Sequence, residues 1–299
     1  MKSIIRTHDL TKQYGKKLAS DKVNININRG DIYGLIGRNG AGKTTVLKMI
    51  SDLIIPTSGQ VKFNDLDESK LNKIGVLIES PGLILELNAK KNIDLKLTAL
   101  GINRKGYAEE LLEIVGLAGE KKTVKQFSLG MKQRLGLAIA LIDDPEILIL
   151  DEPTNGMDPQ GMQDFRNLIK RLSKEKDITI IISSHILDEL SKTANRFGII
   201  DNGKMITEIS SEELAKVDRE KIEIIVENAS EVIKILRSKF KISKIELVDE
   251  KRIQILEDVN TKEMNKYLSE NEIYVEEIFT SHQSLENYYL NLTGGVANV

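Results

Sequence analysis

The sequence predicts an α/β domain with a helical insert, followed by a small α+β module of ferredoxin-like type. Three patterns in the 299-residue chain support this fold class. A short apolar strand at residues 32–36 leads through a glycine-rich loop into a segment with helical spacing. A second apolar strand at 147–150 ends in two carboxylates. Residues 219–279 alternate between strand and helix in the order β-α-β-β-α-β, which is the order of a split β-α-β module.

The N-terminal part is predicted to form two strands, at 3–10 and 22–28, because residues 23–28 alternate strictly between apolar and polar side chains. The polar segment 11–17 between them is predicted to be a turn. It carries one aromatic residue, Tyr14, which either stacks on a nucleotide base or packs as an ordinary loop residue. The residues alone leave both alternatives open.

The glycine-rich loop after the strand at 32–36 fits the phosphate-binding P-loop pattern G-x-x-x-x-G-K-[ST] from Gly37 to Thr44. Glycines allow successive backbone N–H groups to converge, and the N-terminus of the following helix adds partial positive charge. Lys43 is expected to reach the β- and γ-phosphates of ATP, and the Thr44 hydroxyl is expected to ligate Mg²⁺. The loop residues expected to hold the nucleotide are Asn39, Gly40, Ala41, Gly42, Lys43, Thr44 and Thr45.

Beyond the P-loop helix, a turn at 56–60 leads to a strand at 61–63, and residues 73–79 form another strand that ends on Glu79. Residues 88–140 change character, because their leucines and isoleucines recur at helical intervals with few strand signals. We therefore expect a mainly helical subdomain at about 88–140.

The strand at 147–150 is followed by Asp151 and Glu152. This pattern is weak by itself, since buried strands often end in a charged turn. Behind a P-loop in the same chain, however, it predicts the second half of an ATPase site, the Walker B strand. Asp151 is expected beside the Mg²⁺ shell, and Glu152 next to the attacking water.

A further helix is predicted at 161–174, and a further buried strand at 177–182. Residues 183–185, Ser-Ser-His, follow at the C-terminal edge of that strand, where open α/β sheets bind ligands. His185 is expected to hold the γ-phosphate and the attacking water in register. The alternative is that it satisfies a backbone carbonyl near a helix N-terminus.

The C-terminal module is predicted from its alternating short patterns. Its expected strands are 222–226, 245–248, 252–256 and 273–278, and its expected helices are 231–240, 262–268 and a last helix at 285–292.

Composition is that of an ordinary soluble globular protein, with 40% hydrophobic and 29% charged residues. The chain has no apolar run of the roughly 18 residues that a spanning helix needs, and no signal-peptide pattern, so direct membrane insertion is not expected. The absence of cysteine is compatible with the cytoplasm. Residues 218–299 carry 11 Lys and Arg against 16 Asp and Glu, and neither part has the strongly basic face expected of a nucleic-acid binder.

One segment between the helical insert and the Walker B strand is diagnostic. Residues 127–134, Phe-Ser-Leu-Gly-Met-Lys-Gln-Arg, resemble a degenerate form of the Leu-Ser-Gly-Gly-Gln signature of ABC transporter ATP-binding subunits. Residues 155–158 are similar to the D-loop of that family. His185 stands at the position of its switch histidine, and Tyr14 at that of the aromatic residue that packs on adenine.

The resemblance covers about residues 1–215 and implies the P-loop NTPase fold of an ABC ATPase. It places an ATPase domain at 1–217, with the helical subdomain at about 88–140, and a small accessory domain at 218–299. In this family two ATP molecules are sandwiched between two chains. The resemblance therefore implies that Ser128 and Gly130 complete the site of a second copy in a homodimer.

The resemblance also implies a function. The chain would hydrolyse ATP to drive transport through separate integral membrane permease subunits, in the cytoplasm and peripheral on the inner face of the membrane. Two departures concern the site. Glu79 replaces the usual glutamine. Its carboxylate can accept a hydrogen bond from a Mg²⁺-bound water, so Glu79 is assigned to the metal site. Leu129 and Met131 replace a glycine and a glutamine of the signature. The signature form, the segment 77–81 and the closing segment 284–294 resemble the subfamily that exports peptide antibiotics, of the bacitracin and lantibiotic self-protection type.

The sequence is compared with two other functions. A soluble ABC ATPase acting on ribosomes or nucleic acid generally needs two cassettes per chain or long coiled coils, and a more basic surface, and the sequence displays none of these. The other is a nucleotide-dependent regulator in which residues 219–299 sense a ligand, for which the sequence offers no binding site.

Overall fold

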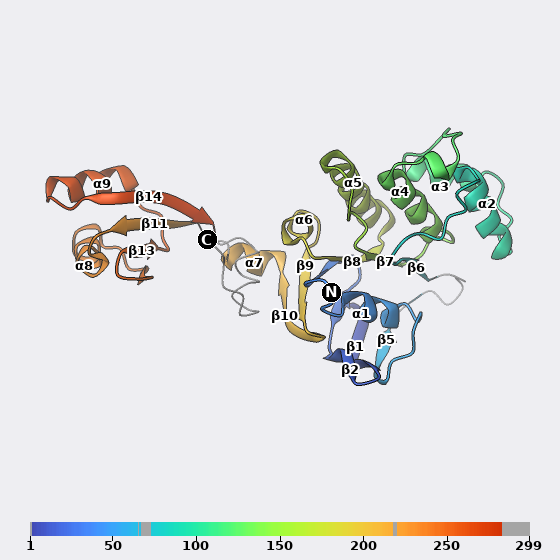
Figure 1. The fold of residues 1–299 in the computed structure, drawn as a ribbon, viewed down its shortest axis with the longest axis horizontal. Helices are drawn as coiled ribbons and strands as arrows, with labels where there is room; N and C mark the ends of the chain where they lie inside the picture. The colour runs from blue at the N-terminus through green and yellow to red at the C-terminus, as the bar shows by residue number, and fades with distance from the viewer. Residues whose placement is uncertain (1, 65, 67–72, 218–219, 283–299) are drawn as a thin grey trace. The chain divides into compact units, whose positions relative to one another are not determined.

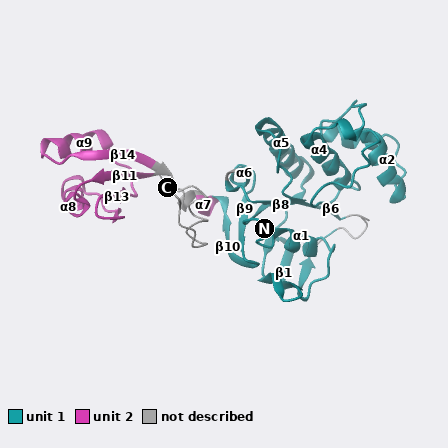
Figure 2. Ribbon diagram, viewed as in Figure 1, with its two compact units in different colours: residues 1–211 teal, residues 212–299 magenta. Residues whose placement is uncertain are grey.

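The computed structural model describes residues 2–64, 66, 73–217 and 220–282. The helix predicted at 285–292 lies outside these residues. The chain divides into two compact units, Met1–Ser211 and Glu212–Val299 (Figure 2). Within the described part of the chain, no helix combines the length and the apolar character needed to cross a lipid bilayer.

The first unit is built on a six-stranded sheet in the order β10-β9-β4-β8-β7-β6. Five of its strands are parallel, and only β10 runs antiparallel to its neighbour β9. Every residue of β4 and β7 is buried, which explains why these two strands are continuous apolar runs in the sequence. The strands are β4 (Ile32–Ile36), β6 (Ile74–Leu77), β7 (Ile147–Asp151), β8 (Thr179–Ser184), β9 (Arg196–Asp201) and β10 (Lys204–Ser210).

A second, antiparallel sheet forms around the long strand β1, which pairs with each of the other three. Its strands are β1 (Ser3–Tyr14), β2 (Lys17–Val23), β3 (Asn26–Asn28) and β5 (Ser58–Phe63).

The predicted turn at 11–17 and the predicted continuous strand at 22–28 are wrong. Strand β1 continues through Tyr14, and the chain reverses at Gly15, whose φ of +58° suits glycine. Pairing with the returning strand decides this, since Thr11 Oγ1 accepts from the Lys22 N–H at 3.0 Å. The polar segment has no alternation of its own from which this pairing could be read.

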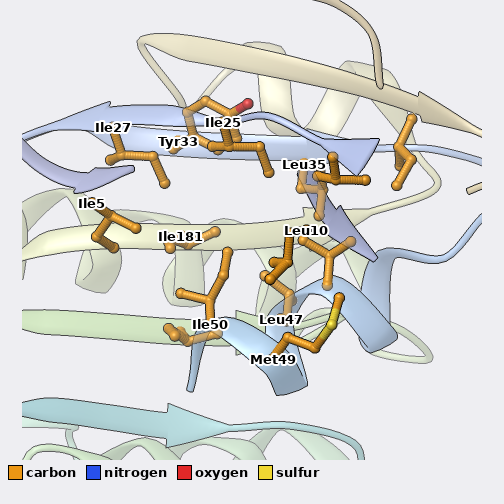
Figure 3. Close-up of a cluster of buried hydrophobic side chains, with 14 of the residues drawn as sticks. Ile5, Leu10, Ile25, Ile27, Tyr33, Leu35, Leu47, Met49, Ile50 and Ile181 are labelled. Carbon is orange, nitrogen blue, oxygen red and sulfur yellow. The ribbon is translucent and has the colours of Figure 1, made fainter. Parts of the chain in front are cut away.

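Helix α1 (Lys43–Ile50) lies between the two sheets (Figure 1). Apolar side chains from both sheets and from the helix meet in one core, as Figure 3 shows for Leu10, Leu35, Leu47 and Ile181. Because Val46, Leu47, Met49 and Ile50 are all buried there, the start of α1 is fixed relative to the ends of β4, β7 and β8.

The other face of the six-stranded sheet is covered by helices (Figure 1). The segment predicted to be helical contains most of them, and its last helix, α4, packs so closely on the segment after β6 that a Cβ on Gly136 would lie 2.6 Å from Pro81 Cβ. The helices are α2 (Ala89–Ala99), α3 (Tyr107–Ile114), a 3₁₀ turn (Val124–Gln126), α4 (Leu129–Ala140), α5 (Pro159–Lys176) and α6 (Leu187–Ser191).

The second unit has its own apolar core and a four-stranded antiparallel sheet in the order β12-β13-β11-β14. After α7, its elements follow one another in the β-α-β-β-α-β order expected from the sequence. They are α7 (Ser211–Val217), β11 (Glu220–Val226), α8 (Ala229–Phe240), β12 (Ile245–Leu247), β13 (Arg252–Ile255), α9 (Thr261–Glu270) and β14 (Val275–His282).

Candidate active site

Three parallel strands of the large sheet end at one edge. In the register, Ile36 of β4 lies beside Ser184 of β8, and Ser183 lies beside Asp151 of β7. The P-loop, Glu152 and His185 therefore follow directly from neighbouring strands. This is the edge at which parallel α/β sheets bind ligands.

The P-loop is shaped by glycine at the start of α1. Gly42 has a φ of +106°, and a Cβ there would lie 2.4 Å from the backbone oxygen of Ala19. Gly42 is also the N-cap of α1 and has no side chain to cap the helix. The backbone N–H groups of the first turn, with the positive end of the helix dipole, are thus left for an anion.

Lys43 is the first residue of this helix and is only 5% exposed. Its Nζ donates to the backbone oxygens of Gly37 at 2.7 Å and Arg38 at 3.2 Å. These bonds fold the side chain back over the P-loop, so that the ammonium group lies within the loop itself. The structure thus places the positive charge where the sequence predicts the phosphates.

Thr44 and Asp151 meet beside the P-loop. The Thr44 hydroxyl donates to Asp151 Oδ2 at 2.7 Å, and Asp151 is 5% exposed. A hydroxyl and a carboxylate are hard oxygen donors that suit Mg²⁺. The described residues contain no group of three or more His, Cys, Asp or Glu side chains that could hold a metal. Thr44 and Asp151 fit Mg²⁺, because this ion is usually bound through one or two carboxylates together with phosphate oxygens and water.

Glu152 lies between Lys43 and His185. Its Oε2 is 2.6 Å from His185 Nδ1, and its Oε1 is 3.0 Å from Lys43 Nζ. The contact with Lys43 is an ion pair without hydrogen-bond geometry, so this buried oxygen accepts no hydrogen bond. The carboxylate, the ammonium and the imidazole form one cluster at the N-terminus of α1. Such a cluster can hold a phosphate and polarise a water molecule.

Glu152 also departs from ordinary backbone geometry. Its φ is +49°, in the left-handed region that residues other than glycine rarely adopt. Strain of this kind persists where the surrounding structure imposes it, and it is concentrated at functional sites.

Glu79 is not joined to this cluster. Its carboxylate accepts from Lys48 Nζ at 2.6 Å, and its side chain is 66% exposed. Since β6 pairs with β7 up to Leu77 and Leu150, Glu79 lies at the same sheet edge as Asp151. Its role as a metal ligand stays a prediction.

Tyr14 lies at the end of β1 with 53% of its surface exposed, and Lys12 Nζ is 5.3 Å from the centre of its ring. An exposed ring face can stack on a base. The exposure of Tyr14 is compatible with stacking on a base and with an ordinary loop residue, so both alternatives stay predictions.

Ser128 and Gly130 lie at the start of α4. Ser128 is its N-cap, and the Ser128 Oγ accepts from the Met131 N–H at 3.3 Å. Both residues line a cavity of about 620 Å³ with residues 156–158 of the D-loop. The described lining residues come from 116–120, 128–134 and 156–161, and none from the P-loop. In this cavity, the signature loop is therefore not joined by the P-loop of its own chain.

Ser183 is a site residue that the sequence did not assign. Its hydroxyl donates to Asp151 Oδ1 at 2.5 Å, and it is fully buried. The available signal was a serine at the carboxyl end of a buried strand. That signal does not say which neighbouring strand the hydroxyl faces.

Comparison with known proteins gives a consistent result. A family model described as ABC transporter matches residues 20–155. The bacitracin transport ATP-binding protein BcrA of Bacillus licheniformis is 44% identical over 302 residues, covering 99% of this chain and 99% of that protein. The lantibiotic transport ATP-binding protein SrtF of Streptococcus pyogenes is 47% identical over 208 residues, covering 69% of this chain and 90% of that protein.

Solved structures are also similar. The dimeric post-hydrolysis state of the ATP-binding cassette MJ0796, bound to ADP and Pi, matches with a TM-score of 0.60 and 28% identity. The match covers 70% of this chain and 99% of that chain.

Proposed function

The chain belongs to the ATP-binding subunits of ABC transporters, and on this premise we propose that it powers export of a peptide antibiotic through separate permease subunits. As a member of this family it binds and hydrolyses ATP. The proposal for the cargo rests on two relatives, whose names assign them to bacitracin and lantibiotic transport. No observation favours a ribosome- or nucleic-acid-associated factor.

The observation that carries the mechanism is the cluster of Lys43, Glu152 and His185 at the N-terminus of α1. On ATP binding, Lys43 transfers from Glu152 and the P-loop carbonyls to the β- and γ-phosphates. Glu152 is then free to accept a hydrogen bond from the attacking water and to polarise it. His185 holds that water and the γ-phosphate in register.

Mg²⁺ is proposed as the second cofactor, held by Thr44 directly and by Asp151 through water. When bound, the ion neutralises charge that develops on the phosphate oxygens. Asp151 already accepts from the Thr44 hydroxyl, so the two residues that would hold the ion lie within hydrogen-bond distance of each other. Glu79 is proposed to accept from a water of the same shell after releasing Lys48.

The nucleotide site is proposed to be completed by a second copy of the chain. Ser128 and Gly130 of that copy offer a hydroxyl and a backbone N–H to the γ-phosphate. The cavity they line is separate from the P-loop of their own chain, which supports a contribution to another subunit. The dimeric state of the similar cassette supports it too.

The remaining assignments complete the proposal. Residues 1–217 form the ATPase domain, with the helical subdomain at about 88–140, and 218–299 form an accessory domain. The protein works in the cytoplasm, attached to the inner face of the membrane through its permeases.

The test uses Glu152→Gln in the full chain. Loss of the carboxylate is expected to lower ATP turnover by at least about 100-fold, because general base catalysis contributes about 10²–10⁴-fold. ATP binding is retained, and light scattering detects a stable ATP-bound dimer. Glu175→Gln, on the exposed face of α5, serves as the matched control. Unchanged hydrolysis in the Glu152 variant would refute the mechanism.

The cargo needs a separate measurement. The chain is co-purified with its permease subunits and reconstituted in lipid. Bacitracin or a lantibiotic is expected to stimulate its ATPase rate, and Glu152→Gln abolishes the stimulation. If neither peptide class changes the rate, the proposed cargo is wrong although the ATPase assignment stands.

A further inference from the structure

A single buried hydroxyl contacts both acidic residues of the Walker B strand. Ser183 lies directly opposite Asp151 in the parallel register of β8 and β7. Its Oγ donates to Asp151 Oδ1 at 2.5 Å and accepts from the backbone N–H of Glu152 at 3.0 Å. It is fully buried.

The hydroxyl fixes the plane of the Asp151 carboxylate. One carboxylate oxygen accepts from Ser183, and the other accepts from Thr44 at 2.7 Å. With a donor on each oxygen, rotation of the carboxylate about its terminal torsion breaks at least one hydrogen bond. Without the serine hydroxyl, Oδ1 would lack a donor in a nearly closed site, where such a loss is costly.

The same residue anchors the turn that directs Glu152. The Glu152 N–H donates both to the backbone oxygen of Ser183, at 3.2 Å, and to its Oγ. At Glu152 the chain adopts its left-handed conformation, and the side chain then reaches Lys43 and His185. Holding this N–H in place fixes the backbone position from which the Glu152 side chain extends.

We propose that Ser183 is a positioning residue for ATP hydrolysis. It orients the Asp151 carboxylate toward Thr44 and the proposed metal, and it holds the backbone turn from which the Glu152 side chain extends. Ser183 is assigned no contact with nucleotide or metal; its role is exerted through Asp151 and Glu152. The inference rests on the roles proposed above for Asp151 and Glu152.

The experiment compares Ser183→Ala with Ser184→Ala in the full chain. Ser184 is the next residue of β8 and is also buried, but its Oγ accepts from the Ile186 N–H at 2.9 Å, away from Asp151. Melting temperature is measured with ATP while Mg²⁺ is titrated, so the readout does not depend on turnover. Removing an outer-shell partner of a metal site typically weakens metal affinity by about 10–100-fold.

For Ser183→Ala we expect the Mg²⁺ concentration at half-maximal shift to rise about tenfold, with turnover reduced. Ser184→Ala is expected to match the wild type within about twofold. Ser183→Thr, which retains the hydroxyl, restores the Mg²⁺ dependence toward the wild type. Melting without nucleotide checks folding; if Ser183→Ala does not fold, Ser183→Cys keeps the size and replaces the hydroxyl by a weak donor.

A Mg²⁺ dependence that is unchanged in the folded Ser183 variant, or shifted equally in Ser184→Ala, overturns the inference. That outcome leaves the proposed function intact if Glu152→Gln has lost hydrolysis. Conversely, full hydrolysis in Glu152→Gln overturns the mechanism whatever Ser183 does. The two failures are therefore distinguishable.

Discussion

Gly42 and Gly40 lie in the same loop and offer a matched test of how the P-loop is held. Both have positive φ, +106° and +82° respectively. A Cβ on Gly42 would lie 2.4 Å from the backbone oxygen of Ala19, whereas a Cβ on Gly40 meets nothing within 4 Å. The two alanine substitutions therefore share the conformational strain and differ in the collision.

The magnitudes follow from this difference. Placing an L residue in the left-handed region costs about 1–2 kcal/mol, which is the whole effect expected for Gly40→Ala. In Gly42→Ala, the collision with main chain that cannot rotate away adds about 1–3 kcal/mol. We expect Gly42→Ala to lower the free energy of unfolding by about 2–5 kcal/mol.

Urea denaturation of the full chain, monitored by circular dichroism, measures the free energy of unfolding of both variants. ATP titration measures how well the P-loop of each variant binds nucleotide. Gly42→Ala is also expected to weaken ATP binding more than Gly40→Ala, because the backbone movement that relieves the collision with Ala19 displaces the N-terminus of α1. Equal destabilisation by the two substitutions would show that the contact with Ala19 does not hold the loop.

Two further predictions concern other contacts. Tyr33 is fully buried and its hydroxyl donates to Glu208 at 2.7 Å; burial, and then the nearby Glu208 carboxylate, raise the pKa of Tyr33 well above 10.0. Tyr33→Phe is expected to lower stability by about 1 kcal/mol at neutral pH. Because the pKa of Tyr33 is raised in the folded state, its contribution to stability is complete below about pH 10 and is lost as pH rises through the folded pKa. The free energy of unfolding, measured in urea, should therefore fall less steeply above pH 10 for Tyr33→Phe than for the wild type. Gly156 has a φ of +78°, so Gly156→Ala is expected to lower the free energy of unfolding by about 1–2 kcal/mol, as in Gly40→Ala. A Cβ there would also lie 3.0 Å from Leu129 Cδ2 in the signature loop, so the variant is expected to reduce ATP-dependent dimerisation seen by light scattering. A Leu129→Gly, Gly156→Ala double variant that dimerises no better than Gly156→Ala contradicts this.

Short-range patterns predicted the elements that carry the chemistry. The strand at 32–36 and the helical spacing at 45–50 are found in β4 and α1, since an apolar run, a glycine loop and helical spacing lie within twenty residues of one another. The apolar run before Asp151 is likewise found as β7. Strands β4 and β7 are buried on all sides, so their sequences display their environment directly.

Where partners are distant, the sequence was silent or misleading. The N-terminal hairpin was misplaced because the pairing of β1 with β2, and not the composition of 11–17, decides where the chain turns. Strands β9 and β10 were not anticipated. The pairing of Glu79 with Lys48 depends on how α1 lies relative to the end of β6, which no local pattern contains.

By itself, the sequence determined which chemical groups the protein possesses: a phosphate-binding loop, a Walker B strand with two carboxylates, and a histidine at a strand end. Only the tertiary structure decided which of them touch. Lys43, Glu152 and His185 meet because three strands far apart in the chain align in one parallel register, and Ser183 reaches Asp151 for the same reason. Register is set by burial of the whole core rather than by any one segment, and it is therefore a property that the folded chain alone possesses.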